Sequence, residues 1–346
     1  MGKAKVLTVA ALFGIGGLAQ AGNLEELKQL LSAKDVQIDM ALTADYLYTT
    51  DRKDGVGDSD QFGYNAYLGI FKEATQKDPV GFGISLGNDW SPVVGIEPLP
   101  SNDNQAKIHE AYVSLKTQYA TIEAGRILTN IGGEAPFTWQ NINIQRGLVW
   151  NGEPVFYNGV RVSTQIDRFS VYAGVNDRDT SDGKMALEAG AATSVNGYVD
   201  ASLSVLLPDA VDDNPTRVYN LTLNISYLPA LPLTFYVDYL DTPKSNGDDI
   251  NSWGAALLGE YKFNDKLSVG GRIEYVNNDG DGDNYSIGTG NSALTLTVTP
   301  KYQIGKYLYI RGEASYVKLS NDYYRKDTNS LKDNEIRLGA EIGFVF

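Results

Sequence analysis

The most constraining feature of this sequence is an apolar–polar alternation with a period of two residues, which recurs from Val36 onward. It is clearest in the last fourteen residues, 333–346, where apolar side chains occupy every second position. A period of two is typical of a β-strand with one apolar face and one polar or small face. About sixteen segments repeat this pattern, separated by turn and loop residues. The sequence therefore predicts a chain that is almost entirely β-structure.

The connections between these segments alternate between short turns and longer polar loops. Asn196-Gly197 is a strong signal for a tight turn, whereas 241–251 and 277–291 are long and polar. Outer-membrane barrels have this alternation, with short turns on the periplasmic side and long loops outside. A strand of about ten residues is long enough to cross a bilayer at a tilt of about 45°.

An exposed sheet edge is not tolerated in lipid, because unpaired backbone groups there cannot bond to water. The pattern therefore predicts an all-β fold: a transmembrane antiparallel up-and-down β-barrel of about 16 strands over residues 36–346. A water-soluble all-β protein is the alternative, and it would have to bury about sixteen apolar strand faces.

The composition agrees with an exported barrel. The chain of 346 residues has no Cys, as expected for an exported protein that needs no disulfide. Its mean hydropathy is mildly polar, because alternating strands average apolar and polar positions. The formal net charge of -14 disfavours nucleic acid as a partner.

The N-terminus reads as a secretory signal. Lys3 and Lys5 precede an uncharged apolar run, and Ala19-Gln20-Ala21 forms a small-x-small cleavage site. The apolar run is shorter than the roughly 20 residues of a membrane-spanning helix. We expect residues 1–21 to be removed and 22–35 to form a short periplasmic helix. Whether this helix plugs the lumen, packs on the barrel or joins subunits stays open.

One long irregular stretch, 127–153, interrupts the strands. A loop of this length within a compact fold is usually functional. Gly132 and Gly133 allow tight bending, and several large apolar side chains could pack on an inner wall. We predict an inward fold that forms the pore constriction. The constriction residues expected to face water are Glu134, Asn141, Asn143 and Arg146. An external flap over a barrel edge or a subunit contact is the alternative.

Strand parity places charged side chains in the lumen. The candidate lumen charges are Arg161, Arg272, Glu274, Arg311, Glu313, Arg337 and Glu341. Arginines on three of the last four strands could face acids on the loop and create a transverse field across the pore. Ion pairs that fill the lumen are the alternative. An excess of acidic over basic side chains predicts a mild cation preference.

Other chemistry finds little support in the sequence. Asp279, Asp281 and Asp283 resemble a calcium loop, but Asn284 and Gly290 occupy positions that require Gly and Glu. A solvated loop is favoured there, so the sequence predicts no metal site. The single histidine, His109, is expected to point outward. No Gly-x-Ser-x-Gly elbow, phosphate loop or dinucleotide fingerprint occurs, so we expect neither an enzyme nor a cofactor.

Two stretches carry a family resemblance. The last strand looks like the recognition strand by which the barrel assembly machinery receives outer-membrane proteins. Its signal positions are Leu338, Ala340, Ile342, Phe344 and Phe346. The second stretch resembles the beta-barrel porin family of the outer-membrane L-like type. Its matching residues are Gly125-Arg126-Ile127-Leu128-Thr129, Gly132-Gly133-Glu134, Asn141, Asn143, Arg146-Gly147, Pro154, Tyr157 and Gly159-Val160-Arg161.

The resemblance implies a sixteen-stranded bacterial porin in the outer membrane of a Gram-negative cell. It further implies a homotrimer whose third external loop, here 127–153, folds into each pore. The expected function is passive diffusion of small hydrophilic solutes and ions between the outside and the periplasm. A plugged structural or adhesive outer-membrane barrel is the alternative function.

Overall fold

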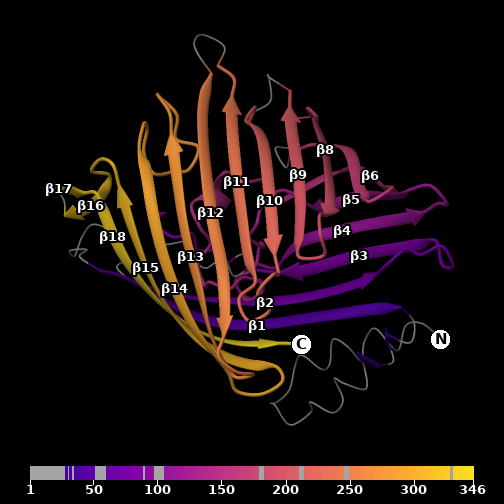
Figure 1. Cartoon of the computed structure of the whole chain (residues 1–346), viewed down its shortest axis with the longest axis horizontal. Helices are drawn as coiled ribbons and strands as arrows, with labels where there is room; N and C mark the ends of the chain where they lie inside the picture. Colours follow the sequence, from indigo (N-terminus) through magenta and orange to yellow (C-terminus); the bar gives the residue numbers. More distant parts are fainter. Residues whose placement is uncertain are drawn as a thin grey trace.

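The protein is described by a computed structural model. It describes residues 28–29, 31–32, 35–50, 60–88, 90–96, 105–178, 183–209, 214–244, 249–327 and 330–346. In this part of the chain, sixteen antiparallel strands close into one barrel, as the sequence predicted (Figure 1). A small hairpin of two more strands, β16 (Tyr324–Asp327) and β17 (Ser330–Lys332), lies in the last long loop.

The barrel strands follow the chain in order around the wall, and each pairs with its sequence neighbours. Their bounds are β1 (Val36–Thr49), β2 (Asp60–Lys72), β3 (Val80–Gly87), β4 (Lys107–Lys116), β5 (Thr121–Leu128), β6 (Phe156–Ile166), β7 (Phe169–Asn176), β8 (Ala186–Ser194), β9 (Val199–Pro208), β10 (Arg217–Ile225), β11 (Leu233–Thr242), β12 (Ile250–Lys262), β13 (Leu267–Asn278), β14 (Ser292–Gln303), β15 (Leu308–Leu319) and β18 (Asn334–Val345).

The first and last strands close the barrel. β18 pairs with β1 in antiparallel register, with Leu42 opposite Phe344 and Tyr48 opposite Leu338. Figure 1 shows the yellow β18 ending beside the indigo β1. Closure satisfies the backbone groups that would otherwise be exposed at two sheet edges, which is a requirement for a sheet in lipid.

The barrel is apolar outside and polar inside. On β14, Leu294, Leu296 and Val298 are exposed on the outer face. The residues between them, Thr295 and Thr297, are buried inside the barrel. Among the described residues, no helix is both long and apolar enough to span a membrane.

A bulge changes the predicted orientation of the only histidine. Ser85 pairs with Glu110 and Leu86 pairs with Ile108, so His109 is the extra residue on β4. An inserted residue breaks the alternation of faces locally. His109 is therefore buried, with its ring 4.8 Å from that of Phe137. The expectation that His109 points outward was wrong for this reason.

The C-terminal residue and the first described residues lie beside β1. Phe346 is buried with Ile38 and Met40, and Leu31 packs against this cluster. Residues 28–29 and 31–32 are helical, within the predicted helix 22–35. The rest of that segment and the predicted signal peptide 1–21 lie outside the described residues.

Candidate functional site

The third long connection, residues 129–155, lies inside the barrel and is called the inner loop below. It contains two short 3-10 turns, η2 (Thr138–Gln140) and η3 (Val149–Gly152). Ile144 is buried in a cluster with Leu47 of β1 and Trp90. Asn143 Nδ2 donates to Thr299 Oγ1 on the inner face of β14 at 2.7 Å. The predicted inward fold of this loop is therefore confirmed.

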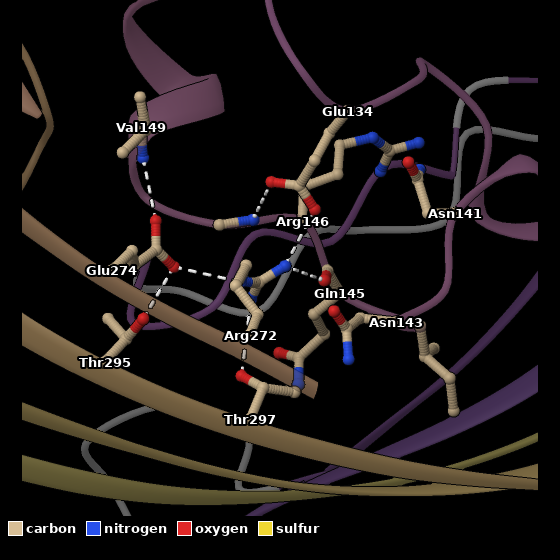
Figure 2. A network of polar contacts seen from close by, with 12 residues as sticks. Glu134, Asn141, Asn143, Gln145, Arg146, Val149, Arg272, Glu274, Thr295 and Thr297 are labelled. Atoms are coloured by element: carbon tan, nitrogen blue, oxygen red, sulfur yellow. Dashed lines mark hydrogen bonds and ion pairs between the residues drawn. The ribbon is translucent and has the colours of Figure 1, made fainter. Parts of the chain in front are cut away.

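The centre of the inner loop is bound to the wall by Arg272 of β13. Its Nη1 lies 2.8 Å from Glu134 Oε1 of the loop, and its Nε lies 3.1 Å from Glu274 Oε2 (Figure 2). The same Nη1 donates to the backbone oxygen of Gln145 at 2.8 Å. Glu134 also accepts the N–H of Gly147 at 2.8 Å. All three charged side chains are fully buried, so this is a desolvated ion network.

Glu274 extends this network along the wall. Its Oε1 accepts the N–H of Val149 at 3.1 Å, and its Oε2 accepts the hydroxyl of Thr295 at 2.6 Å (Figure 2). A Cβ at Gly147 would stand 2.4 Å from Glu274 Oε1. The loop backbone can approach the wall this closely only because residue 147 has no side chain.

Glu313 of β15 provides a second attachment point. Its carboxylate accepts the backbone N–H of Ile144 at 2.5 Å and that of Gln145 at 3.1 Å. It also accepts Nε2 of Gln145 at 3.0 Å and the hydroxyl of Thr299 at 2.8 Å. One buried carboxylate thus satisfies two backbone donors that the irregular loop would otherwise leave unpaired.

Arg311 of β15 binds carbonyl oxygens of the inner loop. It donates to Asn141 O at 2.7 Å and to Thr138 O at 2.8 Å, while its Nε pairs with Glu341 at 2.6 Å. Each contact uses a different nitrogen of the planar guanidinium group.

Arg337 of β18 binds carbonyl oxygens of a second segment, residues 90–96. Its Nη1 donates to Val93 O at 2.9 Å and to Gln145 Oε1 at 3.0 Å, and its Nε donates to Glu335 at 2.8 Å. Val94 N donates to Arg146 O at 2.9 Å, so residues 90–96 lie alongside the inner loop. Neither this segment nor Gln145 was predicted from the sequence; the adjacent apolar residues Val93 and Val94 within a polar loop were the available signal.

Three of the four predicted constriction residues do not face water. The side chain of Glu134 is buried, and Asn143 and Arg146 are buried as whole residues. Arg146 Nε donates to Ala135 O at 3.1 Å, and its guanidinium lies 4.8 Å from the ring of Trp150. Burial lowers the pKa of Arg146 to about 10. The expectation failed because each side chain found a partner in the loop or on the wall.

Asn141, the fourth predicted residue, is half-buried and stabilises the loop itself. Its Oδ1 accepts the N–H of Ala135 at 2.8 Å, and its Nδ2 donates to Phe137 O at 3.0 Å. The amide therefore closes a turn around η2 rather than presenting a polar group to solute.

The predicted lumen charges lie inside the barrel but are paired at close range. Arg161 of β6 lies 2.9 Å from Glu188 of β8, and both are buried. With Arg272, Arg311 and Arg337 in ion pairs as well, no open gap separates a basic wall from an acidic loop in the described structure. The transverse-field hypothesis is not supported, and the alternative of ion pairs within the lumen describes the arrangement.

Two cavities flank the inner loop. One has a volume of about 620 Å³ and reaches from His109 to Asn284; the other, of about 490 Å³, follows 128–136. Both are lined by Pro136, Trp150, Glu153, Pro154 and Val155. Shared lining residues mean that the two spaces adjoin at the end of the inner loop.

Glu153 lies at this junction with its carboxyl beside that of Asp238 on β11. Burial, and then the neighbouring carboxyl, hold the pKa of Glu153 well above its usual range.

The acidic loop between β13 and β14 does not form a calcium cage. Asp283 Oδ1 accepts the N–H groups of Ile287 at 2.8 Å and Gly288 at 3.0 Å. Asp281 is exposed and lies 3.8 Å from the amine of Lys244. In the described ranges, no group of three or more His, Cys, Asp or Glu side chains is placed to hold a metal ion.

Comparisons with known proteins agree with this architecture. The family model described as "Putative beta-barrel porin-2, OmpL-like" matches residues 37–346. No curated protein matches the sequence. The structure of OprB from Pseudomonas putida has a TM-score of 0.64 at 14% identity, covering 94% of this chain and 97% of that one.

Two further solved structures are similar. The trimer form of OmpT from Vibrio cholerae has a TM-score of 0.63 at 11% identity. The anion-selective porin from Comamonas acidovorans has a TM-score of 0.61 at 14% identity. Each alignment covers 90% of this chain and 99% of the other. At these identities the likeness establishes a shared fold.

The family match covers almost the whole described barrel, and the fold has the apolar exterior, closed edge and inner loop of a channel protein. The chain therefore belongs to the family of putative beta-barrel porin-2, OmpL-like, proteins and forms a porin channel in the outer membrane.

Proposed function

We propose that this porin conducts small hydrophilic solutes and ions passively and with a mild cation preference. The observation that carries the proposal is the pair of adjoining cavities, about 620 and 490 Å³, beside the inner loop. A loop that occupies the lumen but leaves adjoining spaces beside it narrows a passage, whereas a plug would fill it. Porins provide passage rather than catalysis, so we infer that the chain has no enzymatic activity.

The charge of the lumen supports the cation preference. The buried arginines are all held by the carboxylates and carbonyl groups described above. The half-buried carboxylates Glu110 and Glu123 lie on the inner face of β4 and β5, and the half-buried cations of these two strands are Lys116 and Arg126. Ser85 Oγ donates to Glu110 at 3.1 Å. Because serine is neutral, this contact does not neutralise the negative charge of the carboxylate. Acidic groups in a narrow polar passage raise the local concentration of cations.

Small residues on the outer wall support the proposal that the protein forms a homotrimer. A hollow on the outside of β1, β14, β15 and β18 is lined by the small residues Ala44, Gly312 and Ala340 between larger apolar side chains. Small side chains allow a neighbouring barrel to approach closely. The solved OmpT structure is of a trimer form. These three small residues are exposed or half-buried on the outer face of their strands.

Planar-bilayer recording tests these proposals together. We expect stepwise conductance, three equal closures for each inserted trimer, and a reversal potential of cationic sign in a KCl gradient. The double variant Glu110→Gln with Glu123→Gln should reduce the cation preference, because it removes two half-buried negative charges from the inner face of the barrel. Glu73→Gln, in the exposed β2–β3 turn, should leave it unchanged. A protein without current steps would support the plugged barrel, and anion selectivity would contradict the charge argument.

We also propose that the barrel assembly machinery recognises the last strand. Leu338 and Ile342 are exposed on the outer face, and Phe346 packs beside β1. Deleting Phe346 should lower the amount of folded protein in outer membranes several-fold, measured by heat-modifiable gel mobility. Phe263→Ala, at an exposed turn, is the matched control. If spontaneous refolding into liposomes falls as much as cellular assembly, the deletion acts on barrel stability and the recognition proposal fails.

A further inference from the structure

Four buried oxygen atoms without hydrogen-bond partners meet where the inner loop joins β11. They are both carboxylate oxygens of Glu153, Oδ2 of Asp238 and the hydroxyl of Tyr285; apart from the contact between the Glu153 and Asp238 carboxyl groups themselves, none has a hydrogen-bond partner among the described residues. Glu153 is 9% exposed, and Asp238 and Tyr285 are 0% exposed. Buried polar groups are almost always satisfied, so four such atoms from three separate segments require an explanation.

The segments bring these oxygens to one place. Asn220 Nδ2 donates to Asp238 Oδ1 at 2.6 Å, so only Oδ2 of that carboxylate remains for another partner. Gly254 of β12 pairs with Asp238 across the sheet. Tyr285 Oη lies 3.1 Å from the position of a Cβ on Gly254, which places the hydroxyl over this strand pair.

Glycines create the space that these side chains occupy. A Cβ on Gly132, where φ is +104°, would stand 2.0 Å from Glu153 Oε2. A Cβ on Gly152 would stand 2.9 Å from the ring of Tyr285. With Gly254, three glycines thus surround the oxygens, and a side chain at any of them would displace one. The cluster is consequently a packed arrangement with fixed walls.

The charge of the cluster is uncompensated. No Lys or Arg nitrogen in the described part of the chain forms an ion pair with Glu153 or Asp238. Arg272 does not neutralise these two carboxyl groups, because it already pairs with Glu134 and Glu274. Buried carboxylates are costly unless they are paired or bind a cation.

We propose that Glu153, Asp238 and Tyr285 form a binding site for a hard divalent cation, with Ca²⁺ the best match. The donors are all oxygen, two carboxylates balance the charge of one divalent ion, and Ca²⁺ accepts irregular oxygen cages completed by water. Glu153 lines both cavities, so the site lies directly behind their shared wall. A bound ion would fix the end of the inner loop to β11 at the junction of the two cavities. This site does not depend on which solute the pore conducts.

Isothermal titration of CaCl₂ into the full-length, detergent-purified protein after EDTA dialysis tests the proposal. We expect one Ca²⁺ per chain. Glu153→Gln and Asp238→Asn should each weaken binding at least about tenfold, because even indirect supports of metal sites have effects of this size. Asp281→Asn is the matched control, since this carboxylate is 91% exposed in the acidic loop, and it should bind as the wild type does.

Thermal unfolding of the wild-type protein provides a second readout that needs no variant. Ca²⁺ should raise the unfolding temperature relative to EDTA, because a ligand that binds only the folded state stabilises it. Absence of both heat and stabilisation with Ca²⁺ would overturn the proposal and indicate that the two carboxyl groups share a proton instead. Binding that is lost in Asp281→Asn but kept in Glu153→Gln would also overturn it, by assigning the ion to the acidic loop.

Discussion

Replacing Arg272 by Met is expected to lower the free energy of unfolding by about 3–5 kcal/mol, because removing one member of a buried ion pair leaves the others uncompensated. Here two carboxylates, those of Glu134 and Glu274, would remain buried without their shared cation. The loop carbonyl of Gln145 would also lose its donor. We therefore expect the inner loop to leave the wall, giving larger and noisier single-channel currents.

The measurement is urea-dependent unfolding in lipid vesicles, paired with bilayer recording. Arg217→Met is the matched control: its ion pair with Asp241 is 2.8 Å long, but its side chain is 35% exposed. Partly exposed pairs contribute about 0–1 kcal/mol. The double variant Glu134→Gln with Arg272→Met should recover part of the loss, because the pair is coupled. Equal effects of Arg272→Met and Arg217→Met would contradict the assignment of Arg272 as the main anchor.

Glu313→Ala should have the second largest effect, a loss of about 2–4 kcal/mol, because several donors lose one common acceptor. These donors are the N–H groups of Ile144 and Gln145, Nε2 of Gln145 and the hydroxyl of Thr299. Lumen water can reach the loop once it loosens, so part of the cost is offset by hydration. The same unfolding assay measures the loss, and the single-channel current should again become noisier.

Glu260→Ala is the control for this second variant. Glu260 is a half-buried carboxylate on β12 that accepts one hydrogen bond, from Ser268 at 2.6 Å, and does not bind the inner loop. Its removal should cost less than about 1 kcal/mol, as for most substitutions away from buried networks. If Glu260→Ala disturbs the current as strongly as Glu313→Ala, the noise does not arise from the inner loop.

The site was only partly predictable. The sequence identified the loop that folds inward and the lumen parity of Arg272, Arg311 and Arg337. It did not show that these arginines bind loop carbonyls, because a backbone carbonyl has no sequence signature. The bulge at His109 was hidden for a similar reason: whether one residue is skipped depends on the register with β3.

The chain by itself determined the architecture. A period of two repeated along about sixteen segments, with alternating short and long connections, allows few arrangements other than a closed barrel in lipid, since the apolar faces need hydrocarbon and the edges need partners. Tertiary structure alone decided what fills the barrel. Glu134 contacts Arg272, and Glu153 contacts Asp238, only because barrel closure brings segments about 85 to 140 residues apart to one wall. At that wall the polar groups lose contact with water, so each is stabilised by pairing with the nearest polar group.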